Sequence, residues 1–345
     1  MRAVRTTTGG GVELADVPAP AVVDREDAVV RIEATAICGT DLHAVAGHLP
    51  GVPAGTRLGH EFVGTVTALG PAATGLQIGD RVVGSDFTSC GRCAACRRGQ
   101  HWHCRERAFL GTGTAFGPEL AGAQAEAVRV PLASTSLFRV PADLDPRLAV
   151  LMSDNLATAF CAVDASRLQA GETVAVVGGG AVGQLCSLAA QLCGAGIVVV
   201  SDPVASRQAW AREHGALACG PDDLAAQLAP WTDAQGADLV LEAVGGSRGL
   251  DAALAVVRPG GRVISVSAHA EASWPLPLAS AFARELTIGF VIGDAVRTRD
   301  RMLSLAAAGL LSGAADLVAT RRLDDAVGAY AAAKGLSALK LLLVP

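Results

Sequence analysis

The pattern of apolar and polar positions changes character near residue 150. Before it, short apolar runs such as AVVRI, FVGTV, DRVVG and AVRV are broken by Gly, Pro and Asp, which predicts an all-β unit with irregular loops. After it, strand-like runs alternate with helical patterns: TVAVV, VGQLCSLAAQLCG, GIVVVSD, ADLVLEAVGG, GLDAALAVV, a turn at RPGG, and RVISVS. This alternation predicts a parallel, doubly wound sheet.

The remainder of the chain adds one apolar run, ELTIGFVIG, two helical patterns, RDRMLSLAAAGLL and LDDAVGAYAAAKG, and a last strand, ALKLLLVP. With 345 residues the chain is long enough for two domains. We therefore expect an α/β protein in which a β-rich unit is followed by a doubly wound one.

Composition and charge exclude several classes of protein. Hydrophobic residues make up 51% of the chain, but no run approaches the ~20 apolar residues of a membrane span. The start, MRAVRTTTGGGVELADV, lacks the apolar stretch of a signal peptide, so we expect a cytoplasmic protein without a membrane partner. The net charge of −5 and the short basic clusters give no indication of a nucleic-acid partner.

Four of the nine cysteines lie within fifteen residues, in CGRCAACRRGQHWHC: Cys90, Cys93, Cys96 and Cys104. Their C-x2-C-x2-C-x7-C spacing fits four thiolates closing a tetrahedron around Zn²⁺. His101 and His103 lie in the same loop and are alternative ligands, but the four-cysteine set is complete without them. Four protein ligands leave no position open for substrate, so the spacing predicts a structural zinc site.

A glycine-rich turn follows the apolar strand at 174–177: Gly178, Gly180 and Gly183 form G-x-G-x-x-G, with Val182 inside the motif and a helical pattern after it. The glycines allow a tight turn, a close approach to pyrophosphate and close helix–strand packing, and the helix N-terminus attracts the phosphates. A second strand, 197–201, ends at Asp202, 24 residues beyond Gly178. The order strand, turn, helix, strand, acid predicts a dinucleotide site.

Asp202 also bears on which dinucleotide is bound. A carboxylate there accepts hydrogen bonds from the adenosine ribose and repels a 2′-phosphate, which favours NAD over NADP. Arg207, five residues later, could bind a phosphate and keeps NADP open as the alternative.

A second, sparser set of metal-ligand types lies upstream. The segment ICGTDLH brings together Cys38, Thr40, Asp41 and His43, and LGHEFVG places His60 and Glu61 after a glycine turn. A thiolate, an imidazole and a carboxylate could bind zinc with room for a fourth ligand. Singly, each residue also fits an ordinary structural role.

Together these motifs resemble the zinc-containing alcohol dehydrogenases of the medium-chain dehydrogenase/reductase superfamily, over essentially the whole chain. The segments LMSDNLATAF and FGPELAGAQAEAVRVP look most like its branch of formaldehyde dehydrogenase-like and polyol enzymes. The resemblance implies a GroES-like β-barrel catalytic domain, residues 1–150 with 291–345, around a Rossmann NAD-binding domain, residues 151–290. It also implies a homodimer or homotetramer, for which ELTIGFVIG would be an apolar edge strand.

The same resemblance implies roles for individual residues. Cys38, His60 and Asp154 would hold a catalytic zinc, with Cys161 as a rival to Asp154, so that each chain would carry two zinc ions. Glu61 would lie beside that zinc, and Asp41 would bond the far nitrogen of His60. Thr40 would donate a hydrogen bond to the zinc-bound alkoxide and pass its proton outward, and His43 would receive that proton through the cofactor ribose and release it to solvent. The remaining expected contacts are to NAD: Thr158, Gly178, Gly180, Val182, Gly183, Asp202 and Arg207.

From the resemblance we expect an enzyme that transfers hydride between an alcohol and NAD, giving an aldehyde or ketone, or the reverse. Candidate substrate contacts are Phe87, Trp102, Leu110, Asn155 and Phe282. One alternative is a dismutase or net non-redox enzyme that recycles tightly bound NAD. A second alternative is a binding protein that uses the four-cysteine segment as a zinc module.

Overall fold

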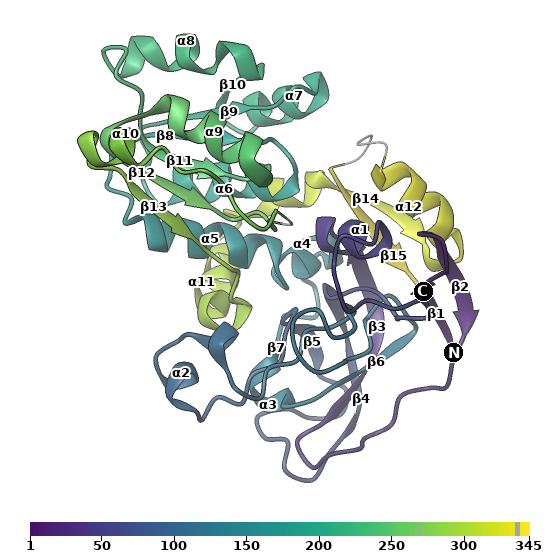
Figure 1. Ribbon diagram of the computed structural model, residues 1–345. Helices are drawn as coiled ribbons and strands as arrows, with labels where there is room; N and C mark the ends of the chain where they lie inside the picture. Colours follow the sequence, from purple (N-terminus) through teal and green to yellow (C-terminus); the bar gives the residue numbers. More distant parts are fainter. Residues whose placement is uncertain (270, 335–338) are drawn as a thin grey trace. The chain divides into compact units, whose positions relative to one another are not determined.

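The computed structural model describes residues 1–269, 271–334 and 339–345. The predicted helix LDDAVGAYAAAKG ends at residue 335 and the predicted strand ALKLLLVP begins at residue 338, and both of these end residues lie outside the described residues. The chain forms two compact units (Figure 1). Unit 1 comprises Met1–Asp154 and Asp294–Pro345, and unit 2 comprises Asn155–Gly293. Neither unit contains a described helix that is long and apolar enough to cross a membrane.

Unit 1 joins the two ends of the chain. Its N-terminal elements are β1 (Arg2–Thr6), β2 (Val12–Asp16), β3 (Ala28–Ile37), α1 (Gly39–Val45), β4 (Phe62–Leu69), β5 (Arg81–Gly84), α2 (Ala94–Arg97), η1 (His101–His103), β6 (Ala127–Val130), α3 (Ala133–Ser136), β7 (Leu137–Arg139) and α4 (Pro146–Leu151). Its C-terminal elements are α11 (Ala295–Ala307), η4 (Ser312–Leu317), β14 (Val318–Arg322), η5 (Leu323–Asp325), α12 (Ala326–Lys334) and β15 (Lys340–Val344).

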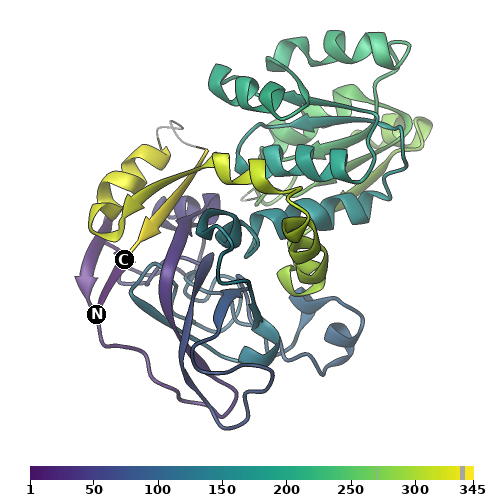
Figure 2. The ribbon, with the colours of Figure 1, turned by 180° about the vertical axis from the view of Figure 1, so that it is seen from behind.

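A seven-stranded sheet organises unit 1, in the order β14-β15-β3-β4-β5-β7, with β6 also paired to β3. The last strand, β15, runs parallel to β14 and antiparallel to β3, with Leu341 opposite Ile37. Figures 1 and 2 show this yellow strand beside the purple N-terminal part of the chain. Segments from the two ends of the sequence therefore share one sheet.

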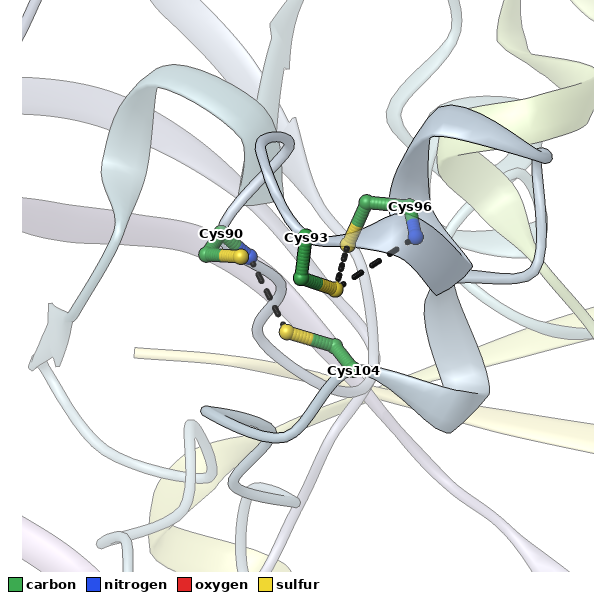
Figure 3. Close-up of side chains that lie close together, drawn as sticks. All are labelled: Cys90, Cys93, Cys96 and Cys104. Carbon is green, nitrogen blue, oxygen red and sulfur yellow. Dashed lines mark hydrogen bonds between the residues drawn. The ribbon is translucent and has the colours of Figure 1, made fainter.

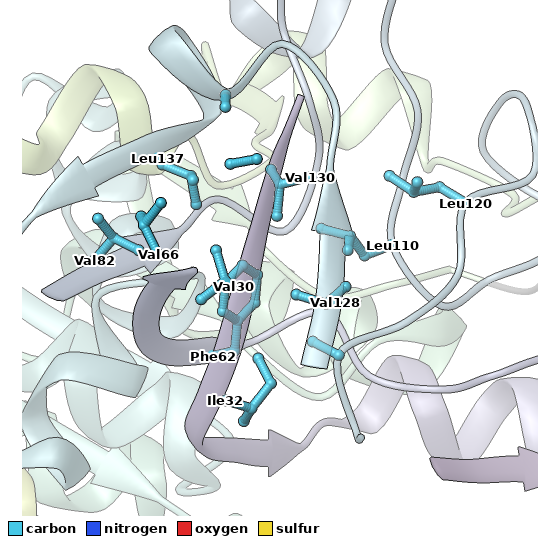
Figure 4. Close-up of a cluster of buried hydrophobic side chains, with 13 residues drawn as sticks. Val30, Ile32, Phe62, Val66, Val82, Leu110, Leu120, Val128, Val130 and Leu137 are labelled. Carbon is cyan, nitrogen blue, oxygen red and sulfur yellow. The ribbon is translucent and has the colours of Figure 1, made fainter. Parts of the chain in front are cut away.

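One hydrophobic core of this unit lies between the strands and the long loop before β6 (Figure 4). Val30, Phe62 and Val128 are all buried in it. A Cβ at Gly84 would meet Cζ of Phe62 at 2.0 Å, so only glycine leaves space for that ring. Leu110 is fully buried in the same cluster, which places this expected substrate contact in the core.

Unit 2 alternates strands with helices: α5 (Asn155–Ser166), β8 (Thr173–Val177), α6 (Ala181–Leu192), β9 (Ile197–Ser201), α7 (Ala205–Glu213), β10 (Leu217–Cys219), η2 (Pro221–Asp223), α8 (Leu224–Leu228), η3 (Ala229–Trp231), β11 (Ala237–Glu242), α9 (Gly246–Val256), β12 (Val257–Ser265), α10 (Leu278–Ala283) and β13 (Thr287–Phe290). Its six strands are parallel, in the order β10-β9-β8-β11-β12-β13. This is the doubly wound order: strands are added outward from β8 to β9 and β10, and then on the other side of β8 from β11 to β13, so the strand order reverses between β8 and β11.

One local prediction in this unit is wrong. The segment RPGG was expected to be a turn, but it lies inside β12, which begins at Val257. The pairing with β11 shifts register between Ala237 and Leu239, and Gly260 adopts a φ of +71°. An irregularity in the strand therefore accommodates residues that usually end one.

Candidate functional site

The first candidate ligand group begins where β3 passes into α1. Cys38 is the N-cap of α1, and its backbone N–H donates to Asp41 Oδ2 over 2.9 Å. Thr40 and His43 follow on the same short helix. The distance from Cys38 Sγ to Thr40 Oγ1 is 4.0 Å, so the local helix start brings a thiol and a hydroxyl together.

Four predicted residues of unit 1 converge: one ligand atom each from Cys38, His60, Glu61 and Asp154 lies within 4.8 Å of the others. Asp154 Oδ2 is 3.8 Å from Cys38 Sγ and 3.8 Å from His60 Nε2. Zinc bonds of about 2.0–2.3 Å place tetrahedral ligand atoms about 3.3–3.8 Å apart. The spacing and the mixed thiolate, imidazole and carboxylate donors therefore fit zinc.

The environment of His60 supports the same fit. Its side chain is fully buried, and neither ring nitrogen makes a hydrogen bond within the described part of the chain. A buried imidazole left in this state is costly. A metal on Nε2 would satisfy that nitrogen, while Nδ1 lies 3.5 Å from Asp41 Oδ1, the arrangement that orients metal-bound histidines.

Asp41 is itself held by several donors. Gly59 N–H donates to its Oδ1 over 3.2 Å, and Gln124 Nε2 donates to its Oδ2 over 3.2 Å. Gln124 in turn accepts from the hydroxyl of Tyr330 on α12 over 2.7 Å. Burial raises the pKa of Tyr330 well above its ordinary value, so this hydroxyl keeps its proton. A buried chain of polar groups thus connects α12 to His60.

Glu61 faces a cation from the last strand. Lys340 Nζ lies 2.6 Å from Glu61 Oε1, and both side chains are buried. Although burial lowers the pKa of Lys340, the carboxylate of Glu61 and the thiolate of Cys38 raise it above its ordinary value. Burial raises the pKa of Glu61, an effect that Lys340 opposes. The ammonium group therefore compensates negative charge that the candidate ligands bring together.

The charge balance also affects the other two ligands. Burial raises the pKa of the Cys38 thiol, and Lys340 opposes this rise. Burial lowers the pKa of His60, but Asp41 and Cys38 outweigh this effect and raise it well above its ordinary value. Without a metal, the site therefore retains protons, which a bound cation would displace.

The four cysteines of the second cluster face one another (Figure 3). Cys93 Sγ is 3.5 Å from Cys96 Sγ, and the Cys90 N–H donates to Cys104 Sγ over 3.3 Å. The ligand atoms of the four lie within 4.8 Å of one another, and neither histidine of the loop belongs to the group. His101 instead contacts Asp294, with 2.9 Å between Nδ1 and Oδ2. This four-thiol set is complete and closed.

The glycine motif adopts the predicted strand–turn–helix form in unit 2. Gly178 follows β8 with a φ of +98°, and Gly180 is the N-cap of α6. A Cβ at Gly183 would lie 1.8 Å from the carbonyl oxygen of Gly178, whereas a Cβ at Gly180 would meet nothing within 4 Å. Gly183 is thus required for packing, and Gly180 leaves open space. Val182 lies in the first turn of α6.

Asp202 follows β9 and is already engaged in this loop. Its Oδ2 accepts from the Gly179 N–H over 2.8 Å, its Oδ1 accepts from the Val204 N–H over 2.8 Å, and Arg207 Nη1 lies 3.3 Å from Oδ2. The carboxylate therefore fixes the turn that would receive the dinucleotide. Arg207 is paired with this carboxylate and does not face solvent alone.

The remaining predicted residues lie on α1 of unit 1 and on α5 of unit 2. His43 Nδ1 is 3.3 Å from His48 Nδ1, and burial together with His48 lowers the pKa of His43. Thr158 and Cys161 are buried in α5 of unit 2, and Cys161 is not in the cluster with Cys38.

Two family models match the chain: "Alcohol dehydrogenase GroES-like domain" over residues 24–142 and "Zinc-binding dehydrogenase" over residues 181–308. "Probable zinc-binding alcohol dehydrogenase Rv1895" of Mycobacterium tuberculosis is 34% identical over 342 residues, covering 99% of this chain and 87% of that relative. The chain belongs to the zinc-binding alcohol dehydrogenases.

Solved structures of similar alcohol dehydrogenases agree with this family. Alcohol dehydrogenase TADH from Thermus sp. ATN1 has a TM-score of 0.93 and 38% identity, covering 100% of this chain and 99% of that one. A zinc-binding dehydrogenase family protein from Sinorhizobium meliloti 1021, solved bound to NADP, has a TM-score of 0.86 and 29% identity, with 100% and 99% covered. The predictions of the fold class and of a zinc-containing alcohol oxidoreductase are confirmed; the branch within the superfamily stays a prediction.

Several polar residues around the site of this alcohol dehydrogenase were missed by sequence reasoning: His48, Gln124, Tyr330 and Lys340. The sequence held one weak signal, a lysine inside the apolar strand ALKLLLVP. A buried charged residue needs a partner, but only the sheet pairing of β15 with β3 identifies that partner as Glu61.

Aromatic side chains adjoin the zinc-ligand candidate His60. Phe109 stacks at a tilt against His60, with ring centroids 5.1 Å apart, and Trp102 contacts Phe109 and Phe87 edge-on. Phe87 and Trp102 of the expected substrate contacts thus lie in one cluster near the metal-ligand group. Phe282, by contrast, is 87% exposed on α10 of unit 2.

Proposed function

We propose that Cys38, His60 and Asp154 hold a catalytic zinc in an NAD-dependent alcohol dehydrogenase, with a primary or secondary alcohol, or the corresponding aldehyde or ketone, as substrate. The observation that supports this most strongly is the convergence of these three ligand types around a buried histidine that makes no hydrogen bond to a described residue. Three ligands leave a coordination position for substrate. When bound, zinc supplies the Lewis acidity that lowers an alcohol hydroxyl pKa, and NAD accepts the hydride.

The residues of unit 1 would handle the proton. Thr40 would donate a hydrogen bond to the substrate oxygen and pass its proton outward, since its hydroxyl lies 4.0 Å from the Cys38 thiol. His43 would release the proton to solvent, and its lowered pKa favours the neutral form that can accept it. Asp41 would hold the tautomer and orientation of His60. Glu61, neutralised by Lys340, would remain close enough to contribute to the metal environment.

A second zinc would be held by Cys90, Cys93, Cys96 and Cys104, giving two ions per chain. Its role would be structural because all four coordination positions come from the protein. The backbone N–H of Cys96 already donates to Cys93 Sγ and lowers the pKa of Cys93, which favours the thiolate form that zinc requires.

NAD is the proposed dinucleotide, and Asp202 is the reason. Its carboxylate is nearly buried against the glycine turn, where it would bind the ribose and repel a 2′-phosphate. Thr158, Gly178, Gly180, Val182 and Gly183 would complete the contacts. NADP is the alternative, supported by Arg207 beside Asp202 and by the NADP-bound relative.

Assembly would use the open edge of the unit 2 sheet. β13 is the terminal strand of this sheet, and Phe290 on it is 62% exposed. Leu278 on α10 is 71% exposed. An exposed apolar edge strand favours pairing with a second copy, so we propose a homodimer or a homotetramer. No disulfide joins the nine cysteines of the described chain, which would suit a reducing, cytoplasmic location.

The test is NADH formation by the purified, zinc-loaded protein with formaldehyde, simple alcohols and polyols. A rise with one class would support the dehydrogenase and indicate its substrate class, including whether it acts like the formaldehyde dehydrogenase-like and polyol enzymes. Cys38→Ala should abolish the rise, and a fully active Cys38→Ala protein would contradict the proposed site. Copurifying nucleotide with no net NADH would instead support the alternative in which bound NAD is recycled.

A further inference from the structure

We propose that His269, acting through Ser265 and Glu242, is a positioning residue for the nicotinamide half of the dinucleotide. This inference rests on the proposed function, because it assigns a role to residues that face the same cofactor. The observation that supports it is a continuous chain of hydrogen bonds that connects the ends of β11 and β12, two adjacent strands of unit 2.

The location of these residues follows from the strand order. Ligands of doubly wound sheets bind outside the carboxyl ends of the strands, at the point where the order reverses, here between β8 and β11. Asp202 after β9 marks the adenosine side. The other half of a dinucleotide therefore extends over β11 and β12, whose last residues are Glu242 and Ser265.

The direction of each hydrogen bond can be assigned. Gly246 N–H donates to His269 Nδ1 over 3.2 Å, so that nitrogen carries no proton, and Nε2–H donates to Ser265 Oγ over 2.8 Å. The Ser265 hydroxyl then donates to Glu242 Oε2 over 2.6 Å. A fully directed network of this kind fixes the orientation of each of its members.

The other oxygen of Glu242 closes the network. Its Oε1 accepts from the N–H groups of Val244 and Gly245, over 2.7 Å and 2.6 Å. Glu242 and Ser265 are buried, whereas 22% of the His269 side chain is exposed. The network thus holds the loop after β11 and the loop after β12 to each other, and His269 is its solvent-facing member.

The same directions exclude a nucleophilic serine at this place. In a Ser–His catalytic pair the imidazole accepts a hydrogen bond from the serine hydroxyl, but here Ser265 accepts a hydrogen bond from His269 Nε2–H and donates one to the carboxylate of Glu242. His269 therefore holds the loops in place and does not act as the base of a serine nucleophile.

The loop after β11 also adjoins the phosphate turn. A Cβ at Gly178 would meet Val244 Cγ2 at 2.8 Å, so the loop after β11 lies directly beside the glycine turn that begins at Gly178. Gly178 has its own anchor on the adenosine side, where its N–H donates to the Ser201 carbonyl over 2.8 Å. Loss of the His269 network should therefore disturb the nicotinamide side and leave the adenosine and phosphate side in place.

The experiment compares two ligands that share all but the nicotinamide. NADH binding is followed by fluorescence titration, and ADP-ribose binding by calorimetry, for the wild type, His269→Phe and the matched control Ser267→Ala, which changes the same loop outside the network. We expect His269→Phe to weaken NADH about tenfold, as the loss of one or two hydrogen bonds would. ADP-ribose affinity and zinc content should change less than about twofold, and Ser267→Ala should match the wild type.

Ser265→Ala tests the same network if His269→Phe unfolds. It should likewise weaken NADH binding and leave ADP-ribose binding nearly unchanged. Unchanged NADH affinity in either variant, or equal weakening of NADH and ADP-ribose, would overturn the inference. Failure of the proposed function would be visible separately, since the wild type itself would then bind neither ligand.

Discussion

Lys340 donates from Nζ to Glu61 Oε1 over 2.6 Å, although 279 residues separate the two in the sequence. Both side chains are buried, and the pair lies beside the thiol and imidazole of the catalytic metal-ligand candidates. Removing one member of a buried ion pair is far more costly than removing both, because the remaining charge loses its compensation.

Lys340→Met should therefore lower the free energy of unfolding by about 3–5 kcal/mol, measured by urea denaturation. The double variant Lys340→Met/Glu61→Gln should recover most of this loss, since it carries no carboxylate that needs the ammonium group. A single variant as stable as the wild type would show that the pair does not compensate charge.

The glycine turn offers a matched pair of substitutions. Gly183→Ala places a methyl group 1.8 Å from the Gly178 carbonyl oxygen and should reduce both stability and dinucleotide binding, whereas Gly180→Ala meets no protein atom within 4 Å. Gly180→Ala should fold normally and weaken only NADH binding, because its methyl group occupies space that pyrophosphate requires. Thermal unfolding and NADH titration of both variants separate the two effects. Equal melting temperatures would contradict the packing role of Gly183.

The cofactor preference should depend on one charge. Asp202→Asn keeps the shape of the side chain but removes the repulsion of a 2′-phosphate, and it releases Arg207 from its ion pair. The ratio of kcat/KM for NAD over NADP should fall at least about tenfold, as expected for a change of about 1.4 kcal/mol. Adding Arg207→Gln should remove the gain with NADP. An unchanged ratio in Asp202→Asn would place the discrimination elsewhere.

The third catalytic ligand can be decided by metal content. Asp154→Ala should reduce bound zinc from about two equivalents to about one, because a site missing a ligand binds metal much more weakly. Cys161→Ala should retain both equivalents, since Cys161 lies outside the cluster. Zinc measured by atomic emission after dialysis gives the answer, and the opposite pattern would make Cys161 the ligand.

The thiols of the metal-free cysteine cluster should differ in reactivity. The Cys96 N–H donates to Cys93 Sγ and lowers the pKa of Cys93 to about 6, while burial raises the pKa of Cys96 to about 12. A lower pKa means more thiolate at a given pH, so at pH 7 iodoacetamide should alkylate Cys93 before Cys96. Fragment mass spectra of the peptide holding both residues measure the order. Its reversal at pH 7 would contradict the assignment, and zinc should protect both.

The features that could be predicted from the sequence are those whose residues lie near one another along the chain. Cys90 to Cys104 and Gly178 to Gly183 depend on spacing and local conformation, and the structure brings each group together as that spacing indicates. The catalytic set was predicted from the family resemblance, since Cys38, His60 and Asp154 come from three separate segments.

The supporting polar groups could not be predicted in this way. Gln124 reaches Asp41 from a loop, Tyr330 reaches Gln124 from α12, and Lys340 reaches Glu61 from β15. Each contact depends on sheet pairing and packing that no local pattern encodes. The turn expected at RPGG failed for a related reason, because pairing with β11 outweighed the preference of Pro and Gly for turns.

The insertion of β15 between β14 and β3 has a consequence for synthesis on the ribosome. Residues 1–154 emerge early, but the edge of β3 that pairs with Leu341–Leu343 has no partner strand from β15 until residues 341–343 have left the exit tunnel. Glu61 meets Lys340 at the same late moment. The strand edge of β3 in the nascent N-terminal segment therefore stays unpaired with β15 while the whole of unit 2 is translated, and open edges of this kind are ones that chaperones protect.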